Sequence, residues 1–169
     1  GTINTDWNNA GNWSAGAVPT NSHAVTISST ASNQPIISSN ATAQSITIQS
    51  AAKLTINSSV TLAVTNSISN NGTICNGGTI SGTIVGTPFV VNPSLSYTAN
   101  PICSNNAANI TLTSSAGATV LWSRASVVGI SQPASSGTGT LISEVLTSTN
   151  ATSTNVLYLA TATLGGCTS

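Results

Sequence analysis

The chain has 169 residues, of which only 2% are charged, and its formal net charge at neutral pH is zero. A typical globular chain carries about 25% charged residues, so Ser, Thr, Asn and Gly must supply most of the polar surface. The two cationic side chains are too few to neutralise the phosphates of a nucleic acid. No apolar run approaches the roughly 20 residues of a membrane-spanning helix. The apolar residues also alternate too regularly for a disordered chain. The composition therefore excludes nucleic-acid binding, a helical membrane span and a disordered chain.

The first predicted element is a cap over residues 6–19, which read DWNNAGNWSAGAVP. Its density of Gly, Asn and Pro rules out a long regular element. Trp7 and Trp13 carry large rings that can each bury about 150–250 Å², and the open end of a solenoid is a surface that they fit. We therefore expect an N-terminal cap. The alternative is that both tryptophans are exposed and stack on sugar rings.

Pairs of apolar residues, two positions apart, follow from residue 25 onward. Period two within a pair is typical of a strand with one buried face, and the polar gaps between pairs are too short for helices. Corresponding positions recur after 21 residues from Val25 to Ile46 and after 20 from Leu54 to Ile74. This pattern predicts a parallel β-solenoid of about three coils. The defining pairs are Val25 and Ile27, Ile46 and Ile48, Leu54 and Ile56, and Leu62 and Val64.

Asn-Gly and Gly-Gly steps lie between the later pairs, within the short runs NNGT, NGGT and SGT. Glycine and asparagine are the residues that accept a positive φ at the least steric cost. We therefore expect these steps to mark tight corners with positive φ, at which the chain turns from one short strand into the next.

The run NAGNWSAGAVPTNSHAVTI, followed by LTINSSVTLAVTNSISNNGTI, resembles the head of many large secreted surface proteins of Bacteroidetes. In those proteins an NWS-G-x-P cap leads into right-handed parallel β-helix coils. The resemblance implies the same cap and coil here, in an extracellular or cell-surface chain of the adhesin type. His23 departs from the pattern, because that position is commonly acidic in the family.

The pattern of glycine corners stops at TPFVVNP, residues 87–93, where prolines interrupt the chain. We place a domain boundary there, with a capped solenoid domain at 1–88 and a second domain at 89–169. About seven short strands separated by ordinary turn clusters are typical of an antiparallel sandwich, and Trp122 is expected to pack between its two sheets. The apolar positions that indicate these strands are Leu95, Tyr97, Ile110, Leu112, Val120, Leu141, Val145, Val156, Tyr158 and Ala160.

The second domain is similar to the PKD-like, immunoglobulin-type repeats that occur in tandem in Bacteroidetes adhesins and secreted proteins. The matching features are the CS start at Cys103, the central Trp122, the GIS loop at 129–131 and the terminal GCTS at 166–169. The resemblance implies an immunoglobulin-like β-sandwich and a modular cell-surface architecture. It brings no catalytic residues with it.

The chain has three cysteines, so one remains if the other two form a disulfide. Cys103 and Cys167 bracket the second domain, and we expect a disulfide between them that ties its first strand to its last. Chain-entropy models give such a closure roughly 4 kcal/mol, which suits a small domain in an oxidising compartment. Cys75 is then a buried free thiol or a link to another chain. The alternative is that all three cysteines are buried thiols.

Residues for catalysis, metal binding or cofactor binding do not cluster in the sequence. Asp6 and Glu144 are the two acids, so a two-carboxylate hydrolase would need them to meet from different domains, within roughly 5–10 Å. His23 is the single histidine, and we expect it at the surface rather than in a Ser-His-Asp or metal site. We therefore predict no enzyme activity, no metal site and no cofactor.

The leading functional hypothesis is a structural module of an extracellular filament, adhesin or cell-surface layer. Near-zero net charge favours association, and the exposed edges of sheets pair readily with another chain. The expected partners are further copies in a homo-oligomer or filament, or neighbouring repeats of a larger chain. The alternative is a carbohydrate-binding module that presents a Trp7/Trp13 face to surface glycans.

Overall fold

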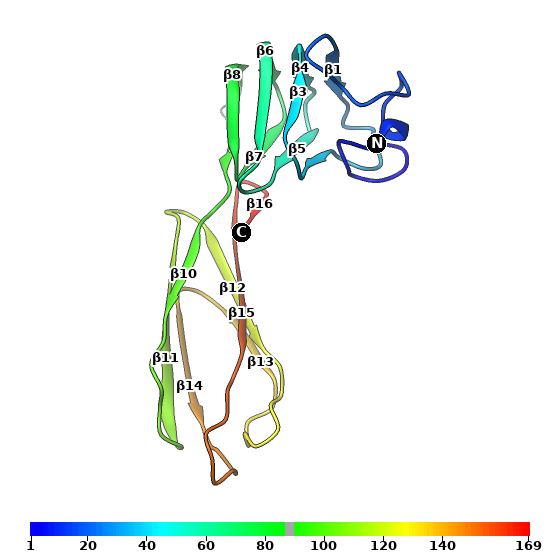
Figure 1. Ribbon diagram of the computed structural model, residues 1–169. Coiled ribbons are helices and arrows are strands. Elements are labelled where there is room, and N and C mark those ends of the chain that lie inside the picture. The colour runs from blue at the N-terminus through cyan, green and yellow to red at the C-terminus, as the bar shows by residue number, and fades with distance from the viewer. Residues whose placement is uncertain (87–89) are drawn as a thin grey trace. The chain divides into compact units, whose positions relative to one another are not determined.

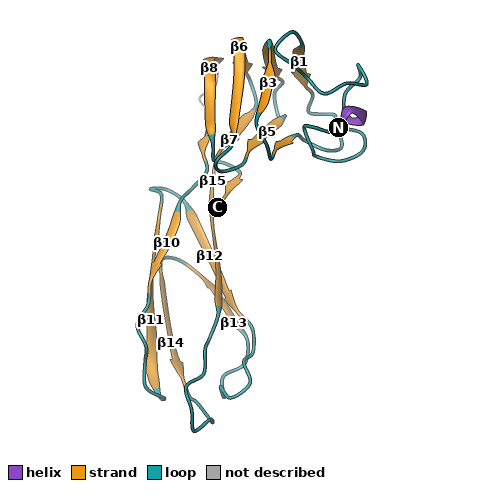
Figure 2. Cartoon of the chain, viewed as in Figure 1, coloured by secondary structure: helices purple, strands orange, loops and turns teal. Residues whose placement is uncertain are grey.

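The computed structural model of the chain describes residues 1–86 and 90–169, and of residues 90 and 91 it describes the backbone alone. Within these ranges the chain is all-β, with sixteen strands and one short 3-10 turn, η1 (Ala10–Asn12) (Figure 2). It divides into two compact units, Gly1–Asn92 and Pro93–Ser169, which we call the solenoid unit and the C-terminal unit. The predicted boundary between residues 88 and 89 lies outside the described residues.

The solenoid unit is built from short strands that stack in parallel (Figure 1). One sheet has the order β1-β4-β6-β3, with β8 also paired to β6, and the other has the order β2-β5-β7-β9. The strands are β1 (Ala24–Ile27), β2 (Ile36–Ile37), β3 (Ala41–Ala43), β4 (Ser45–Ile48), β5 (Lys53–Ile56), β6 (Thr61–Asn70), β7 (Thr73–Asn76), β8 (Thr79–Gly86) and β9 (Val90–Val91).

The spacing of the apolar pairs correctly predicts which residues stack on one another. Val25 lies beside Ile46 in the ladder between β1 and β4, and Leu54 lies beside Ile74 between β5 and β7. Ile46 continues to Ile68 of β6. The predicted parallel β-solenoid of about three turns is therefore confirmed.

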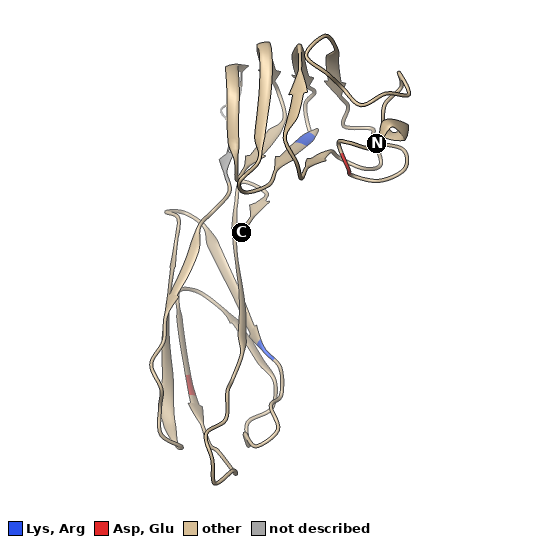
Figure 3. Cartoon of the chain, in the orientation of Figure 1, with Lys and Arg blue, Asp and Glu red and all other residues tan. Residues whose placement is uncertain are grey.

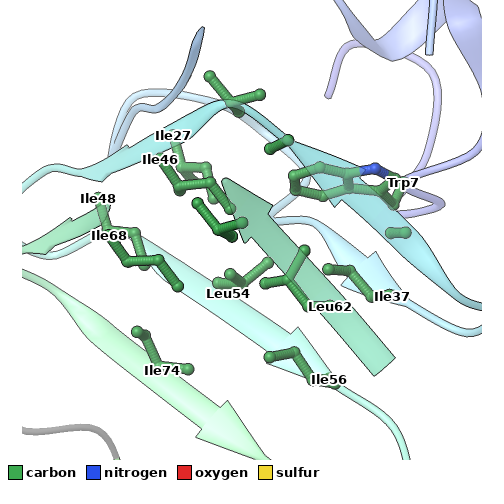
Figure 4. Close-up of a cluster of buried hydrophobic side chains, with 14 of the residues drawn as sticks. Trp7, Ile27, Ile37, Ile46, Ile48, Leu54, Ile56, Leu62, Ile68 and Ile74 are labelled. Atoms are coloured by element: carbon green, nitrogen blue, oxygen red, sulfur yellow. The ribbon is translucent and has the colours of Figure 1, made fainter. Parts of the chain in front are cut away.

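One continuous aliphatic cluster fills the inside of the solenoid (Figure 4). Alternate residues of β1, β4 and β5 are buried, as the period of two requires. Each fully buried Ile or Leu contributes about 1.5–3 kcal/mol relative to an exposed one, so the stacked rungs supply most of the stabilisation of this unit. The largest of these buried side chains are Ile37, Ile46, Ile48, Leu54, Ile56, Leu62, Ile68 and Ile74, together with Trp7.

The glycines at two corners have a different role from the one predicted. Positive φ is found at Gly82 of the SGT run, at 141°, but not at Gly72 or Gly78. A Cβ atom on Gly72 would lie 2.3 Å from the carbonyl oxygen of Ala52, and one on Gly78 would lie 2.1 Å from that of Val60. The prediction of positive φ is therefore wrong at NNGT and NGGT, where glycine is needed because each turn lies directly against the carbonyl groups of the turn before it.

The C-terminal unit consists of two antiparallel sheets (Figure 1). One has the order β10-β11-β14, and the other has the order β13-β12-β15-β16. The strands are β10 (Leu95–Thr98), β11 (Asn106–Ser114), β12 (Thr119–Arg124), β13 (Ser135–Thr138), β14 (Leu141–Leu146), β15 (Tyr158–Leu164) and β16 (Cys167–Thr168).

Both sheets contribute to one small core in the C-terminal unit. Leu112 and Ile142 come from the three-stranded sheet, and Val120 and Ala162 come from the four-stranded sheet. Trp122 lies on β12, between β13 and β15, and packs against this cluster, but it remains half-buried. The core between the sheets is therefore covered only in part.

Candidate functional site

The N-terminal segment places both of its tryptophans against the first turn of the solenoid. Trp7 has no exposed surface and belongs to the aliphatic cluster, next to Ile37 in Figure 4. Its backbone N–H donates to the carbonyl oxygen of Ile36 at 3.1 Å, and the N–H of Ile36 donates to that of Thr5 at 2.7 Å. The segment thus pairs with the edge strand β2 as well as covering the core, which removes an edge open to other strands.

Trp13 packs on Trp7 from outside the core. The two ring centroids lie 4.8 Å apart with an angle of 69° between the planes, an edge-to-face arrangement that aromatic rings favour. The indole Nε1 of Trp13 donates a hydrogen bond to the carbonyl oxygen of Trp7 at 2.8 Å. Trp13 is half-buried. The pair therefore has one ring inside the core and one at its margin.

An amide network holds the cap in shape. The Oδ1 atom of Asn12 accepts hydrogen bonds from the N–H groups of Ile3 and Asn4, both at 3.0 Å. Its Nδ2 atom donates to Asn4 Oδ1 and to the carbonyl oxygen of Asp6, both at 2.7 Å. The Asp6 carboxylate accepts from the N–H of Asn8 at 2.9 Å. The side chains of Asn12 and Asp6 are thus engaged within the cap itself.

A cleft of about 390 Å³ lies beside the cap, lined by Trp13, Asn4, Asp6 and Thr30 among others. Sugar stacking needs an exposed ring face, and Trp7 has none. The alternative of a stacking face made by Trp7 and Trp13 together is therefore wrong for Trp7, because its indole lies in the core. Any contact with a glycan is restricted to the cleft and to Trp13.

A buried ionic cluster joins the two sheets of the C-terminal unit, and sequence reasoning did not foresee it. Arg124 of β12 is 1% exposed, and its Nε lies 3.0 Å from Oε2 of Glu144 on β14. The hydroxyl of Tyr158 donates to the same carboxylate oxygen at 2.6 Å. The Arg124 guanidinium also donates to the carbonyl oxygen of Pro133 at 2.7 Å. Figure 3 shows how few charged residues the chain has besides this pair.

The hydrogen bonds of the cluster shift the ionisation of its members. Burial of the Glu144 carboxyl favours its neutral form, but hydrogen bonds from Arg124, Tyr158 and Ser135 outweigh burial and lower the Glu144 pKa. The hydrogen bond to Glu144 raises the pKa of Arg124. Burial, together with the hydrogen bond to Glu144, raises the pKa of Tyr158 to about 12. Glu144 is therefore charged and engaged, and it is not poised as a general acid.

The cysteines do not pair as predicted. Cys103 is a free, exposed thiol, whereas Cys75 and Cys167 are disulfide-bonded. Cys103 lies in the loop after β10 and lines a cavity together with Tyr158, the first residue of β15. Cys167 is the ladder partner of Leu164, the last residue of β15. The length of β15, about 20 Å, separates these ends, and a disulfide requires Cα atoms about 4.4–6.8 Å apart. The Cys103–Cys167 bridge and the buried free thiol at Cys75 are therefore both wrong.

The two acids that a hydrolase would have to bring together do not meet within either unit. Asp6 belongs to the cap and Glu144 to the ionic cluster of the C-terminal unit, so each has its own local partners. His23 is exposed in the turn before β1, where its Nδ1 lies 2.7 Å from the hydroxyl of Thr20. Among the described residues no three His, Cys, Asp or Glu side chains gather as a metal site would require. No helix in the described part of the chain is long and apolar enough to cross a membrane.

A groove of about 290 Å³ opens between the edge strand β10 and the strand β15 of the C-terminal unit. Its lining is largely apolar and includes Leu95, Ile110, Ile142, Tyr158 and Ala160. These residues also form or flank the small core. The groove is therefore a gap in the interior between the two sheets, and not a pocket with polar groups arranged for chemistry.

Comparison with protein families gives one match, at residues 1–81, to a domain described as a domain of unknown function (DUF8693). The match covers the cap and most of the solenoid unit, just under half of the chain. Comparisons with curated proteins and with solved structures found no match.

Proposed function

We propose that this chain is a non-enzymatic structural module of an extracellular filament, adhesin or cell-surface layer, of the kind found in secreted surface proteins of Bacteroidetes. The observation that carries the proposal is the open strand edge of the C-terminal unit. There β10 and β15 flank an apolar groove in a chain with almost no charge to repel a second copy. Copies of the module associate with one another through such β edges.

The tandem arrangement of two β units supports a modular surface protein. The solenoid is right-handed in this proposal, as nearly all parallel crossover connections are. The C-terminal unit is an immunoglobulin-like, PKD-like sandwich, a proposal supported by its two antiparallel sheets, its shared core and Trp122 on a middle strand. Disulfide-bonded Cys75 and Cys167 support an extracellular location, because such bonds persist in oxidising compartments.

Sedimentation velocity and negative-stain electron microscopy of the purified chain test the proposal. We expect oligomers or filaments that grow with protein concentration, and we expect them to persist when salt is added, because so few charges take part. A chain that stays monomeric up to the highest soluble concentration would contradict self-association.

A carbohydrate-binding module is the second candidate, favoured by the cleft of about 390 Å³ beside Trp13. A glycan array with the wild-type chain and with Trp13→Phe and Trp13→Ala tests it. Stacking predicts that retention is kept in part by the phenyl ring and lost with alanine. Thermal unfolding of each variant separates lost binding from lost folding. An array without any bound glycan removes this candidate.

A further inference from the structure

The backbone of β15 is unpaired along part of one edge. Its partner β16 contacts only the end of the strand, at Thr163 and Leu164. The ladder continues for one more residue, because the N–H of Ser169 donates to the carbonyl oxygen of Ala162 at 2.9 Å. Backbone groups alternate in direction along a strand, so those of Ala160 and Tyr158 point to the same side as those of Ala162. Among the described strands, none pairs with β15 on that side of these two residues.

The facing edge, β10, exposes a side chain that belongs to the interior. Tyr97 pairs with Leu112 in the ladder, so the two side chains lie on the same face of the sheet. Leu112 is 5% exposed, as expected of a core residue, but Tyr97 is 75% exposed. The difference arises because no described strand covers the interior next to β10. The groove between β10 and β15 is the space that such a strand would occupy.

Neither edge has the features by which natural proteins protect a free strand. Lysine, proline or an inward-pointing charge usually blocks pairing at such an edge, and residues 95–98 and 156–164 contain none of them. Two large apolar side chains beside the β15 edge, Leu157 and Leu159, are 72% and 65% exposed. The edge therefore offers backbone hydrogen bonds, apolar contact and no electrostatic barrier.

We propose that the edge of β15 at Tyr158 and Ala160 pairs with the same edge of a second copy of this chain. The two strands run antiparallel, in the direction that β16 already takes beside β15. The four-stranded sheet of each copy then continues into that of the other, and the second copy covers Tyr97 and the groove. This inference rests on the self-association proposed above and names the surface that carries it.

A second copy fits this edge for reasons of charge and symmetry. The groove lining contains no charged residue, and the chain has a formal net charge of zero, so the approach of an identical surface is not opposed. A two-fold axis perpendicular to the paired strands sets identical strands antiparallel and makes the contact self-complementary. The β15–β16 ladder is antiparallel, so an antiparallel strand from the second copy would continue it.

The test compares two variants that add the same charge to different edges of one sheet. Tyr97→Lys places an ammonium in the proposed contact, whereas Leu141→Lys places it on β14, the opposite edge, where Leu141 is 56% exposed. Sedimentation equilibrium should show a dimer dissociation constant raised by at least about tenfold in Tyr97→Lys and by no more than about twofold in Leu141→Lys. Both positions are exposed, so neither variant is expected to prevent folding.

Amide hydrogen exchange provides a second measurement on the unmodified chain. The N–H groups of Tyr158 and Ala160 should exchange more slowly as protein concentration rises, because pairing gives them acceptors in the second copy. Ala160→Pro removes one of these donors without touching the β12 ladder, and should also weaken the dimer. Unchanged exchange of these two amides in a sample that has dimerised would overturn the inference.

The outcomes separate this inference from the proposed function. Oligomers that survive Tyr97→Lys and dissolve in Leu141→Lys would place the contact on another edge, which overturns the inference and leaves the function standing. Closed dimers that never extend into filaments would support the inference and contradict the filament. A monomeric chain that binds a synthetic uncharged strand peptide in this groove would show that the occupant is not a second copy, and the inference fails.

Discussion

The solenoid unit and the C-terminal unit bury their apolar side chains with different completeness. In the described part of the chain, sixteen residues form the buried cluster of the first and four form that of the second. The cap closes the first turn of the solenoid, whereas the groove between β10 and β15 leaves the second core open. Each solenoid turn meets the next through parallel ladders, so burial increases with every turn. Two facing sheets must instead be covered along every edge before their core is closed.

The N-terminal cap and the C-terminal unit also differ in how far apart in sequence their polar partners lie. In the cap the Asn12 side chain bonds to backbone groups within ten residues along the chain. In the C-terminal unit an Arg–Glu pair 20 residues apart in sequence spans the two sheets. Local amide bonds hold the shape of one segment. The ion pair fixes one sheet against the other in a unit that has few core residues to do so.

The largest expected effect in this comparison comes from the cap. Trp7→Ala should lower the free energy of unfolding of the solenoid unit by about 3–5 kcal/mol, as large aromatic truncations in cores do. Trp13→Ala, at the margin of the same core, should cost about 1–2 kcal/mol. Urea unfolding followed by circular dichroism measures both. An equal or larger loss for Trp13→Ala would mean that the outer ring, not the buried one, seals the solenoid.

The next effect concerns the ionic cluster. Arg124→Met should lower the free energy of unfolding of the C-terminal unit by about 3 kcal/mol, because it leaves the Glu144 carboxylate with its strongest partner removed. Glu144→Gln in the same background should then cost less than it does alone, by at least about 1 kcal/mol. Strictly additive losses in this double-mutant cycle would show that the pair does not connect the two sheets.

A smaller effect distinguishes two neighbouring glycines of one corner. Gly78→Ala should destabilise the solenoid unit by about 2 kcal/mol, because its Cβ would lie 2.1 Å from the carbonyl oxygen of Val60. Gly77→Ala should cost about 1 kcal/mol or less, since its nearest neighbour is the end of the Asn92 side chain at 3.0 Å. The two variants have the same composition, so thermal unfolding compares them directly. Equal losses would argue against close stacking of the turns at this corner.

The smallest effect is a dependence on pH that belongs to the C-terminal unit. The Glu144 pKa is lower in the folded state than its ordinary value of 4.5, so its contribution to stability is present above that pH and is lost as the pH falls through the folded value. The pKa of Tyr158 is raised from 10.0 to about 12, so its contribution is present below pH 10 and is lost as the pH rises toward 12. The free energy of unfolding of Glu144→Gln should lack the decline at acidic pH that we expect of the wild-type chain. An unchanged decline would assign it to another group.

Much of the solenoid could be predicted from sequence because its order is local. The period of two within each strand and the recurrence of Val25 at Ile46 directly encode which residues are buried and which stack. The position of Trp7 followed from the size of its ring and the glycine-rich segment around it. The role of Gly78 could not be predicted, because no local sequence pattern indicates that its backbone lies close to a carbonyl group of the preceding turn.

The C-terminal unit was harder to predict because its contacts are distant. Arg124 and Glu144 lie on different sheets, and nothing in the alternation of their strands indicates that they face each other. The cysteine pairing was misjudged because order along the chain was taken to reflect distance in space, whereas Cys103 and Cys167 lie near opposite ends of β15. The groove was missed because strand patterns give the number of strands, but not which edges remain uncovered.

The pairing of Arg124 with Glu144 has a consequence for how solvent conditions act on the molecule. These two groups account for half of the four formally charged side chains and cancel each other inside one unit, so little long-range field remains for dissolved ions to screen. Simple salts such as sodium chloride should therefore leave the proposed association between copies of the chain nearly unaffected. Sulfate should strengthen it and cooling should weaken it, because contacts made of apolar surface respond to the cohesion of water rather than to ionic strength.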